Sequence, residues 1–203
     1  MAASSSLKNM ALCLTLVCFI CSAILGVVYA VTFEPISQAN ANILKAGIAK
    51  VLPEGTVISE EKTATAGDKS YNYYEAADAS GAVVAYAVKS ETVGFGGPIS
   101  LMVGVLTDGT IYNTSVLSQS ETPGLGAKCD SDAAFMSQWN NLAPDKVLKV
   151  KKDGGDIDAI TASTITSRAY TEAVANAKAL ALTLAAAGKA NVTSTVAEGR
   201  GNE

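Results

Sequence analysis

Residues 99–117 read ISLMVGVLTDGTIYNTSVL, two runs of apolar and β-branched residues that flank Asp108 and Gly109. An Asp-Gly pair between such runs is a strong short-range signal for a β-hairpin, and it predicts a two-residue turn here. Another strand-like run, AVVAYAVK, precedes them at residues 82–89. The stretch therefore predicts an antiparallel sheet, with a flexible turn at Gly94–Pro98 that could also let the backbone approach a ligand.

Three stretches around this sheet have apolar residues at helical spacing. They are Ile36 to Leu52, DAAFMSQWNNL at residues 132–142, and a last stretch from about Ser167 to Ala187. Pro53 follows the first stretch and Gly188 the third, and both residue types commonly end helices.

Smaller features refine this picture. Asp130 or Ser131 can cap the helix at residues 132–142, and Trp139 lies on its apolar face, which predicts a core residue rather than a cofactor platform. A tyrosine cluster with partial alternation suits an edge strand, at Tyr71, Tyr73 and Tyr74. We therefore expect an α+β domain at residues 34–190, with an antiparallel sheet and flanking helices, followed by a mobile tail at residues 191–203.

The N-terminal segment, residues 1–33, has the composition of a transmembrane helix. No charged residue occurs from Asn9 to Phe33, and a bilayer requires about 20 apolar helical residues. A cleaved signal peptide is the alternative, but its apolar core is shorter, about 7–15 residues. Because Lys8 and the amino terminus precede the span and Glu34 follows it, we expect a single pass with a cytoplasmic N-terminus and an extracytoplasmic domain.

Composition excludes several functions for this chain of 203 residues. It contains no histidine and has a formal net charge of −4. Without histidine, Ser/His/Asp, Cys/His and His-zinc chemistry are absent, and no metal site is predicted. The acidic balance argues against nucleic acid as a partner. Three cysteines within the span, Cys13, Cys18 and Cys21, act as small apolar residues, while Cys129 has no intramolecular disulfide partner outside it.

A cluster of hydroxyls precedes the last helix. Residues 160–170 read ITASTITSRAY, in which Thr161, Ser163, Thr164, Thr166 and Ser167 carry hydroxyl groups. The start of a helix stabilises an anion through unpaired amides and the helix dipole, so a phosphate would fit here. The alternative is an ordinary N-cap, but a cap requires one hydroxyl and leaves the others without a role.

A second candidate stretch is SQSETPGLGAK, residues 118–128, directly after the hairpin. Gly124 and Gly126 permit close approach of the backbone, and Leu125 offers apolar surface. Its composition alone is that of an ordinary loop.

Together these features resemble the FMN-binding domain shared by the G subunit of the Rnf electron-transport complex and the C subunit of the sodium-translocating NADH:quinone oxidoreductase. The resemblance follows the order of the chain: the apolar span and Glu34-Pro35-Ile36, the segment VLPEG from Val51, the strand ISLMVGVL, the segment ETPGLG from Glu121, and the late threonine motif. In that family an aspartate followed shortly by a Ser/Thr-Gly-Ala-Thr pattern marks the residue that carries the cofactor. Asp158 and the tetrad ending at Thr164 occupy this pattern here.

The resemblance implies that Thr164 is esterified to the phosphate of FMN by a separate flavin transferase. Because the chain has no histidine base, self-attachment is not expected. Ala162 stands where glycine is usual, which disfavours a left-handed backbone there, and Ser163 stands where alanine is usual. Ser163 and Thr166 therefore remain rival acceptors. The implied cofactor-binding residues are Thr164, Ser163, Glu121, Thr122, Gly124, Leu125 and Gly126.

The function implied is an electron carrier of a bacterial cytoplasmic-membrane complex, the ion-translocating ferredoxin:NAD oxidoreductase Rnf. The chain would be a flavoprotein and phosphoprotein that works with the other Rnf proteins and is no complete enzyme alone, since it offers no catalytic residue of its own. The alternatives are the C subunit of the sodium-translocating NADH:quinone oxidoreductase, a membrane-anchored module that binds an anion or flavin noncovalently, and a protein with a purely structural role in assembly.

Overall fold

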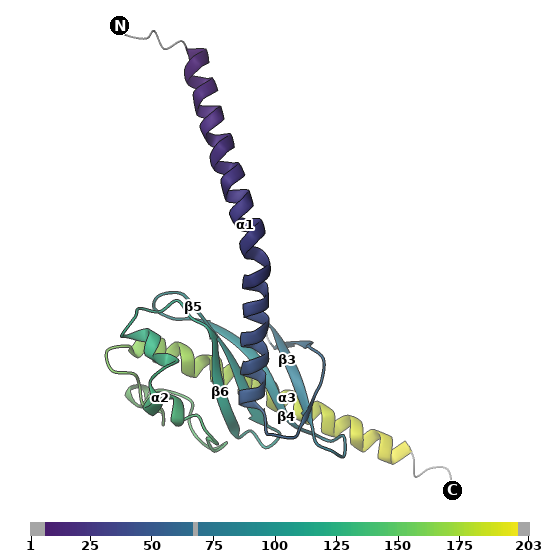
Figure 1. Cartoon of the computed structure of the whole chain (residues 1–203). Helices are drawn as coiled ribbons and strands as arrows, with labels where there is room; N and C mark the ends of the chain where they lie inside the picture. The colour runs from purple at the N-terminus through teal and green to yellow at the C-terminus, as the bar shows by residue number, and fades with distance from the viewer. Residues whose placement is uncertain (1–6, 67–68, 199–203) are drawn as a thin grey trace. The chain divides into compact units, whose positions relative to one another are not determined.

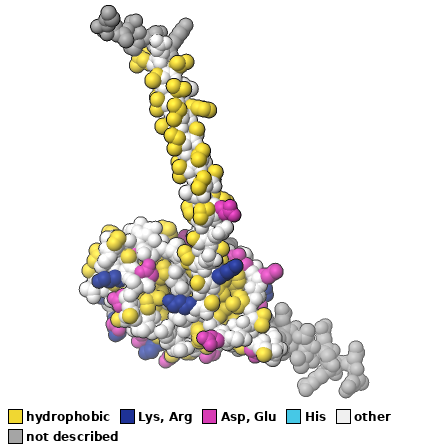
Figure 2. Space-filling model, viewed as in Figure 1, with side chains coloured by type: hydrophobic (Ala, Val, Ile, Leu, Met, Phe, Trp, Pro, Cys, Tyr) yellow, Lys and Arg dark blue, Asp and Glu magenta, His cyan; other side chains and the backbone are white. Residues whose placement is uncertain are grey.

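The computed structural model describes residues 7–66 and 69–198. The chain divides into two compact units, with the boundary between Ile43 and Leu44. Helix α1 (Leu7–Val51) joins the apolar span and the predicted helix at residues 36–52 into one element, with Pro35 inside it (Figure 1). The described side chains before Leu44 are exposed and mostly hydrophobic (Figure 2). This helix is long and apolar enough to cross a membrane.

The second unit is built on a six-stranded antiparallel sheet, which confirms the predicted α+β class. Its strands are β1 (Val57–Ile58), β2 (Lys62–Ala66), β3 (Lys69–Ala77), β4 (Val83–Val93), β5 (Pro98–Leu106) and β6 (Ile111–Ser118). The strand order is β1-β3-β4-β5-β6, and β2 also pairs with β3. The strands predicted around residues 82–117 are therefore confirmed as the neighbours β4, β5 and β6.

The β5–β6 hairpin forms as predicted, but its turn is longer than two residues. Gly109 N donates to Leu106 O at 2.9 Å, and Leu106 N donates to Thr110 O at 2.9 Å, so three residues lie in the loop. Asp108 is not at positive φ, which a two-residue type I′ turn would require, whereas Gly109 has φ 90°. Asp108 Oδ1 accepts from Thr110 N at 2.8 Å instead, an Asx contact that favours the wider turn.

The tyrosine-rich strand β3 is an interior strand, so the predicted edge strand is wrong. It pairs with β4 on one side and with β1 and β2 on the other. Tyr71 and Tyr73 pack into the core on one face of the sheet, and Tyr74 packs into a second core on the opposite face. The partial alternation that suggested an edge strand reflects side chains packed on both faces of the sheet, while β1 and β2 pair with the outer edge of β3.

Short helices follow β6. They are η1 (Gly126–Cys129), α2 (Ala133–Ser137) and η2 (Lys151–Asp153). The predicted caps of the second are wrong: Asp132 caps α2, and its Oδ1 accepts from Ala134 N at 2.9 Å. Trp139 is fully buried between Phe135 and Tyr170, which confirms it as a core residue.

Helix α3 (Thr164–Glu198) covers one face of the sheet and contacts β4 and β5 (Figure 1). It continues past Gly188, so the predicted end there is wrong. One glycine in a helix interior costs about 1 kcal/mol of helix stability. The high helix propensity of the surrounding alanines offsets this cost. Residues 191–198 are helical, residues 199–203 lie outside the described part, and the mobility of the tail stays a prediction.

The opposite face of the sheet is covered by the end of α1. Ile48, Val51 and Leu52 pack there against Met102 and the alanines of β3 and β4. Gly104 of β5 lies directly under this helix end, and a Cβ at position 104 would overlap the carbonyl of Val51. The last turns of α1 therefore belong to the folded domain.

We expect Gly104→Ala to lower the free energy of unfolding by about 1–3 kcal/mol, because the added methyl group displaces the α1 backbone. Gly188→Ala is the matched control. Its Cβ would meet only the Tyr86 hydroxyl at 3.9 Å, so we expect it to be neutral or to stabilise by about 0.5–1 kcal/mol. Urea unfolding followed by Trp139 fluorescence measures both. Equal effects of the two substitutions would contradict the close packing at Gly104.

Candidate functional site

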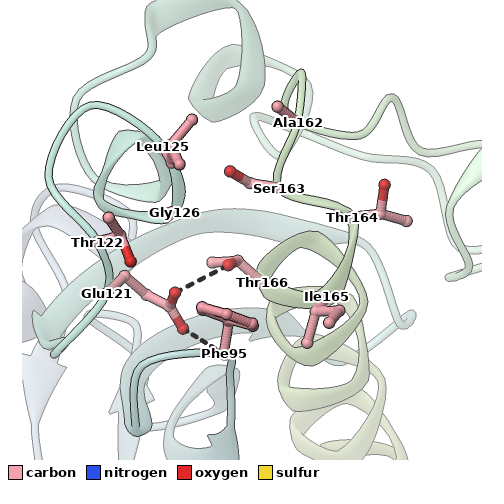
Figure 3. A pocket seen from close by; sticks show the side chains of 10 residues that line it. All are labelled: Phe95, Glu121, Thr122, Leu125, Gly126, Ala162, Ser163, Thr164, Ile165 and Thr166. Carbon is pink, nitrogen blue, oxygen red and sulfur yellow. Dashed lines mark hydrogen bonds between the residues drawn. The ribbon is translucent and has the colours of Figure 1, made fainter.

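A cavity of about 350 Å³ lies where three segments meet: the β4–β5 turn, the segment after β6, and the first turn of α3 (Figure 3). Its volume is within the usual range for small-molecule sites. The lining residues are Phe95, Glu121, Thr122, Leu125, Gly126, Ala162, Ser163, Thr164, Ile165 and Thr166. The structure thus brings together two stretches that are about forty residues apart in the sequence.

Six of the seven cofactor-binding residues implied by the sequence line this cavity. The exception is Gly124, which is not among the lining residues and has φ 77° in the turn before η1. Its positive φ gives it a backbone role in that turn. Sequence reasoning did not select Phe95, Ala162, Ile165 and Thr166 as cofactor-binding residues, although it noted the turn that contains Phe95 and considered Thr166 as a rival acceptor.

Glu121 joins the three segments. Its side chain is buried, and Oε1 accepts from Phe95 N at 2.7 Å and from Gly96 N at 3.3 Å. Its other oxygen, Oε2, accepts from Thr166 Oγ1 at 3.0 Å (Figure 3). Among the described residues no lysine or arginine forms an ion pair with it. Hydrogen bonds alone therefore support this carboxylate, which is costly to bury without them.

Glycines allow this close packing around Glu121. A Cβ at Gly94 would overlap Oε1 of Glu121, and a Cβ at Gly126 would overlap Oε2 and come within 2.7 Å of Thr166 Oγ1. Larger residues at either position would break the contacts that hold the segments together.

The hydroxyl cluster divides into groups with different partners. Ser167 Oγ accepts from Ile160 N and donates to Ser163 O, both at 2.9 Å, and so closes the turn before α3. Thr166 is bonded to Glu121. Ser163 Oγ is buried and has no hydrogen-bond partner among the described residues. Thr164 is half-buried, lines the cavity, and its hydroxyl makes no hydrogen bond within the described chain.

The backbone at the start of α3 offers free donors. Ser163 N donates to Ile160 O and Ser167 N to Ser163 O, both at 3.0 Å. Within the described chain, no acceptor is found for the amides of the intervening residues, Thr164, Ile165 and Thr166. Unpaired amides at a helix start favour an anion, so this end of the cavity suits a phosphate.

Ala162 has φ 61°, the left-handed conformation that the sequence predicted to be disfavoured there. The backbone keeps the conformation in spite of the side chain, at a cost of about 1 kcal/mol for a residue other than glycine. The turn before α3 therefore has a left-handed residue at position 162.

The chain before the hydroxyl cluster is held by contacts that the sequence did not reveal. Gln138, which follows α2, bonds to both backbone groups of Asp158: Oε1 accepts from its N–H at 2.9 Å and Nε2 donates to its carbonyl at 3.1 Å. The Asp158 carboxylate is exposed and pairs with Lys151 at 2.7 Å. No sequence signal links Gln138 to Asp158, because the contact depends on the tertiary fold.

Arg168 and Cys129 lie close to the site without lining the cavity. Arg168 makes two hydrogen bonds of 2.7 Å to Asp153, which lower the pKa of that carboxyl group and tie η2 to α3. Burial raises the pKa of the Cys129 thiol to about 12, so it stays protonated and inert at neutral pH.

The family model and the sequence relatives that match this chain agree on one family. The FMN-binding domain family matches residues 94–179, which include all the residues that line the cavity. The G subunit of the proton-translocating ferredoxin:NAD(+) oxidoreductase complex of Clostridium ljungdahlii is 35% identical over 166 residues, covering 81% of this chain and 85% of that protein. The G subunit of the ion-translocating oxidoreductase complex of Methanosarcina acetivorans is 35% identical, covering 77% and 86%.

A solved structure also aligns. It is the C subunit of the Na+-translocating NADH-quinone reductase of Parabacteroides distasonis, with a TM-score of 0.44 and 23% identity over 59% of this chain and 74% of that one. The alignments with the two relatives at 35% identity cover most of this chain and most of each relative. The chain belongs to the family of G subunits of the ion-translocating Rnf oxidoreductase complexes, with an FMN-binding domain.

Proposed function

We propose that this protein carries FMN, bound covalently through Thr164, and serves as the electron-carrying G subunit of a membrane-bound ion-translocating oxidoreductase. The observation that carries the proposal is the start of α3, where Thr164 lines the cavity and three successive amides have no acceptor in the described chain. A phosphoester there keeps a negative charge that these amides and the helix dipole stabilise.

The surroundings of the three candidate hydroxyls favour Thr164 as the acceptor. Thr166 is 1% exposed and its hydroxyl is bonded to Glu121. Ser163 is buried with its hydroxyl enclosed. Thr164 is the most accessible of the three and its hydroxyl is free of hydrogen bonds within the described chain. An enzyme that modifies the folded protein would therefore reach Thr164 first.

The residues of the cavity fit FMN at both ends. Bound FMN would supply a flavin ring that accepts and donates electrons. The amides at the start of α3 hold the phosphate, and the apolar side chains of Leu125 and Ile165 offer contact area to an uncharged ring. Glu121 keeps the walls of the cavity in place and leaves neither of its oxygens free of a protein donor.

The attachment requires a separate flavin transferase. Thr164 Oγ1 bonds to the phosphorus of an activated flavin nucleotide, loses its proton to a base of the transferase and displaces the leaving group of the nucleotide. The described chain offers no base beside it, since the one carboxylate that lines the cavity, Glu121, is engaged with three donors.

The family supports the proposed complex, and the charge pattern supports the proposed topology. The relatives from Clostridium ljungdahlii and Shewanella baltica are named as G subunits of ion-translocating oxidoreductase complexes, so the partners of this chain are the other subunits of such a complex. Helix α1 anchors the protein in the cytoplasmic membrane with its N-terminus in the cytoplasm, and the FMN domain lies outside the cytoplasm. The names of these relatives favour the Rnf complex over the quinone reductase.

The second candidate function is noncovalent binding of a flavin or another anion. The free amides at the start of α3 favour it, because they would attract a phosphate whether or not a covalent bond forms. Covalent attachment is the feature that separates the two functions.

We expect the protein, co-expressed with a flavin transferase, to gain the mass of one FMN group that survives denaturation, and Thr164→Ala to abolish this gain. Thr183→Ala is the control, because Thr183 is exposed on the same helix, lies outside the threonine motif and does not line the cavity. Intact-protein mass spectrometry decides. A gain that persists in Thr164→Ala overturns the acceptor, and a wild-type protein without any gain favours the noncovalent module.

We expect Glu121→Ala to lower the free energy of unfolding by about 3 kcal/mol, because it leaves the buried Thr166 hydroxyl and the part-buried Phe95 N–H without partners. Glu121→Gln should cost about 1 kcal/mol, since the amide oxygen can still accept from Phe95 N while the NH₂ group faces Thr166. Urea unfolding of the apoprotein gives both values. Equal losses in the two variants would contradict this account, because glutamine fills the same space as glutamate and keeps the acceptor for Phe95 N.

Ala162→Gly should raise the free energy of unfolding by up to about 1 kcal/mol. Glycine adopts positive φ without strain, so the substitution removes most of the strain that alanine has at φ 61°. FMN loading should be unchanged or faster, since the turn that presents Thr164 keeps its shape. The thermal midpoint and a time course of mass gain measure the two effects. A lower midpoint would contradict the left-handed backbone at residue 162.

A further inference from the structure

We propose that Phe95 forms an aromatic wall of the cofactor site, against which the ring system of the flavin packs. The inference rests on the proposed function and adds a contact from the β4–β5 turn, a segment that the threonine motif and the loop after β6 do not include. Phe95 lines the same cavity as Thr164.

The exposure of Phe95 is the first argument. Its side chain is 70% exposed, although an aromatic ring in water loses the free energy that burial would give. Two other apolar side chains that line the cavity are also exposed, Leu125 at 44% and Ile165 at 52%. Three exposed apolar residues around one cavity indicate a surface that an apolar ligand covers.

The rigidity of the turn is the second argument. Phe95 N donates to the buried Glu121, and Gly94 N donates to Gly97 O at 2.8 Å, which closes the turn. Gly96 packs so closely on Ser120 that a Cβ there would overlap the Ser120 carbonyl. The backbone that carries the exposed ring is therefore fixed, and a fixed aromatic wall binds a planar ligand at little cost in entropy.

The arrangement of the cavity is the third argument. In Figure 3, Phe95 and Ile165 lie on the side of the cavity away from Ala162 and Ser163. The cavity lining thus combines the apolar side chains of Phe95 and Ile165 with the hydroxyl of Thr164 and the free amides at the start of α3. A phosphate joined to a flat apolar ring matches this combination, and aromatic rings prefer to stack or to meet edge to face at such contacts.

Val93 provides a matched control. It lies two residues from Phe95 at the end of β4, is 78% exposed and does not line the cavity. A substitution at Val93 changes the same hairpin without changing the cavity wall.

The experiment measures flavin emission in the loaded protein, since stacked indole rings quench flavins on contact. Phe95→Trp, Val93→Trp and wild type are co-expressed with a flavin transferase, and mass spectrometry confirms one FMN in each. We expect flavin emission per bound FMN to fall about tenfold in Phe95→Trp, where the indole stacks on the ring, and to stay within about twofold of wild type in Val93→Trp.

A second variant does not depend on the larger ring. Phe95→Leu should make the bound flavin more accessible to iodide, with a quenching constant about threefold above that of wild type, because the aromatic cover is lost. Val93→Leu should leave this constant unchanged. Circular dichroism verifies that each variant is folded.

The outcomes separate the two proposals. If every protein carries FMN but Phe95→Trp and Phe95→Leu match their Val93 controls, Phe95 is no part of the site and the proposed function stands. If the wild type gains no FMN, both proposals are wrong. Emission and quenching that change only at Phe95 support the aromatic wall.

Discussion

The site depends on one buried carboxylate. Glu121 receives hydrogen bonds from the β4–β5 turn and from α3, while its own backbone belongs to the segment after β6. Its partners Phe95 and Thr166 are 26 and 45 residues away along the chain. Because no cation pairs with it in the described chain, the carboxylate is stable only while these donors are in place, so the three segments must assemble together. Hydrogen bonds within the chain therefore hold the shape of the cavity.

Local patterns predicted most of the scaffold. The β4, β5 and β6 strands, the Trp139 core position and the start of the last helix follow from alternation, a turn pair and helical spacing over short stretches. The errors arose where hydrogen-bonded partners outside the pattern decide the outcome. Strand β3 is interior because β1 and β2 cover its edge, and the hairpin turn is wider because Asp108 bonds to Thr110. Neither contact leaves a signal in the alternation of the sequence.

The candidate site shows the same division. The threonine motif and the loop after β6 were visible as unusual composition, and they supply most of the cavity. Phe95 was seen only as part of a glycine-rich turn, because its place in the site depends on Glu121 reaching across from another segment. No feature of the sequence predicted the contact of Gln138 with Asp158, since a single glutamine after a short helix forms no recognisable pattern.

The many hydroxyls before α3 have separate roles, whereas an N-cap would require only one of them. Ser167 closes the turn with the backbone of Ile160, and Thr166 holds Glu121, so two of the hydroxyls build the frame. These bonds fix the first turn of α3 on the cavity and leave Thr164 facing it with its hydroxyl free within the described chain. Under the proposed function, a Thr164 hydroxyl that had to help hold the fold would be unavailable for esterification. The hydroxyls of Thr166 and Ser167 thus hold the first turn of α3 and leave the Thr164 hydroxyl without a bond in the described chain.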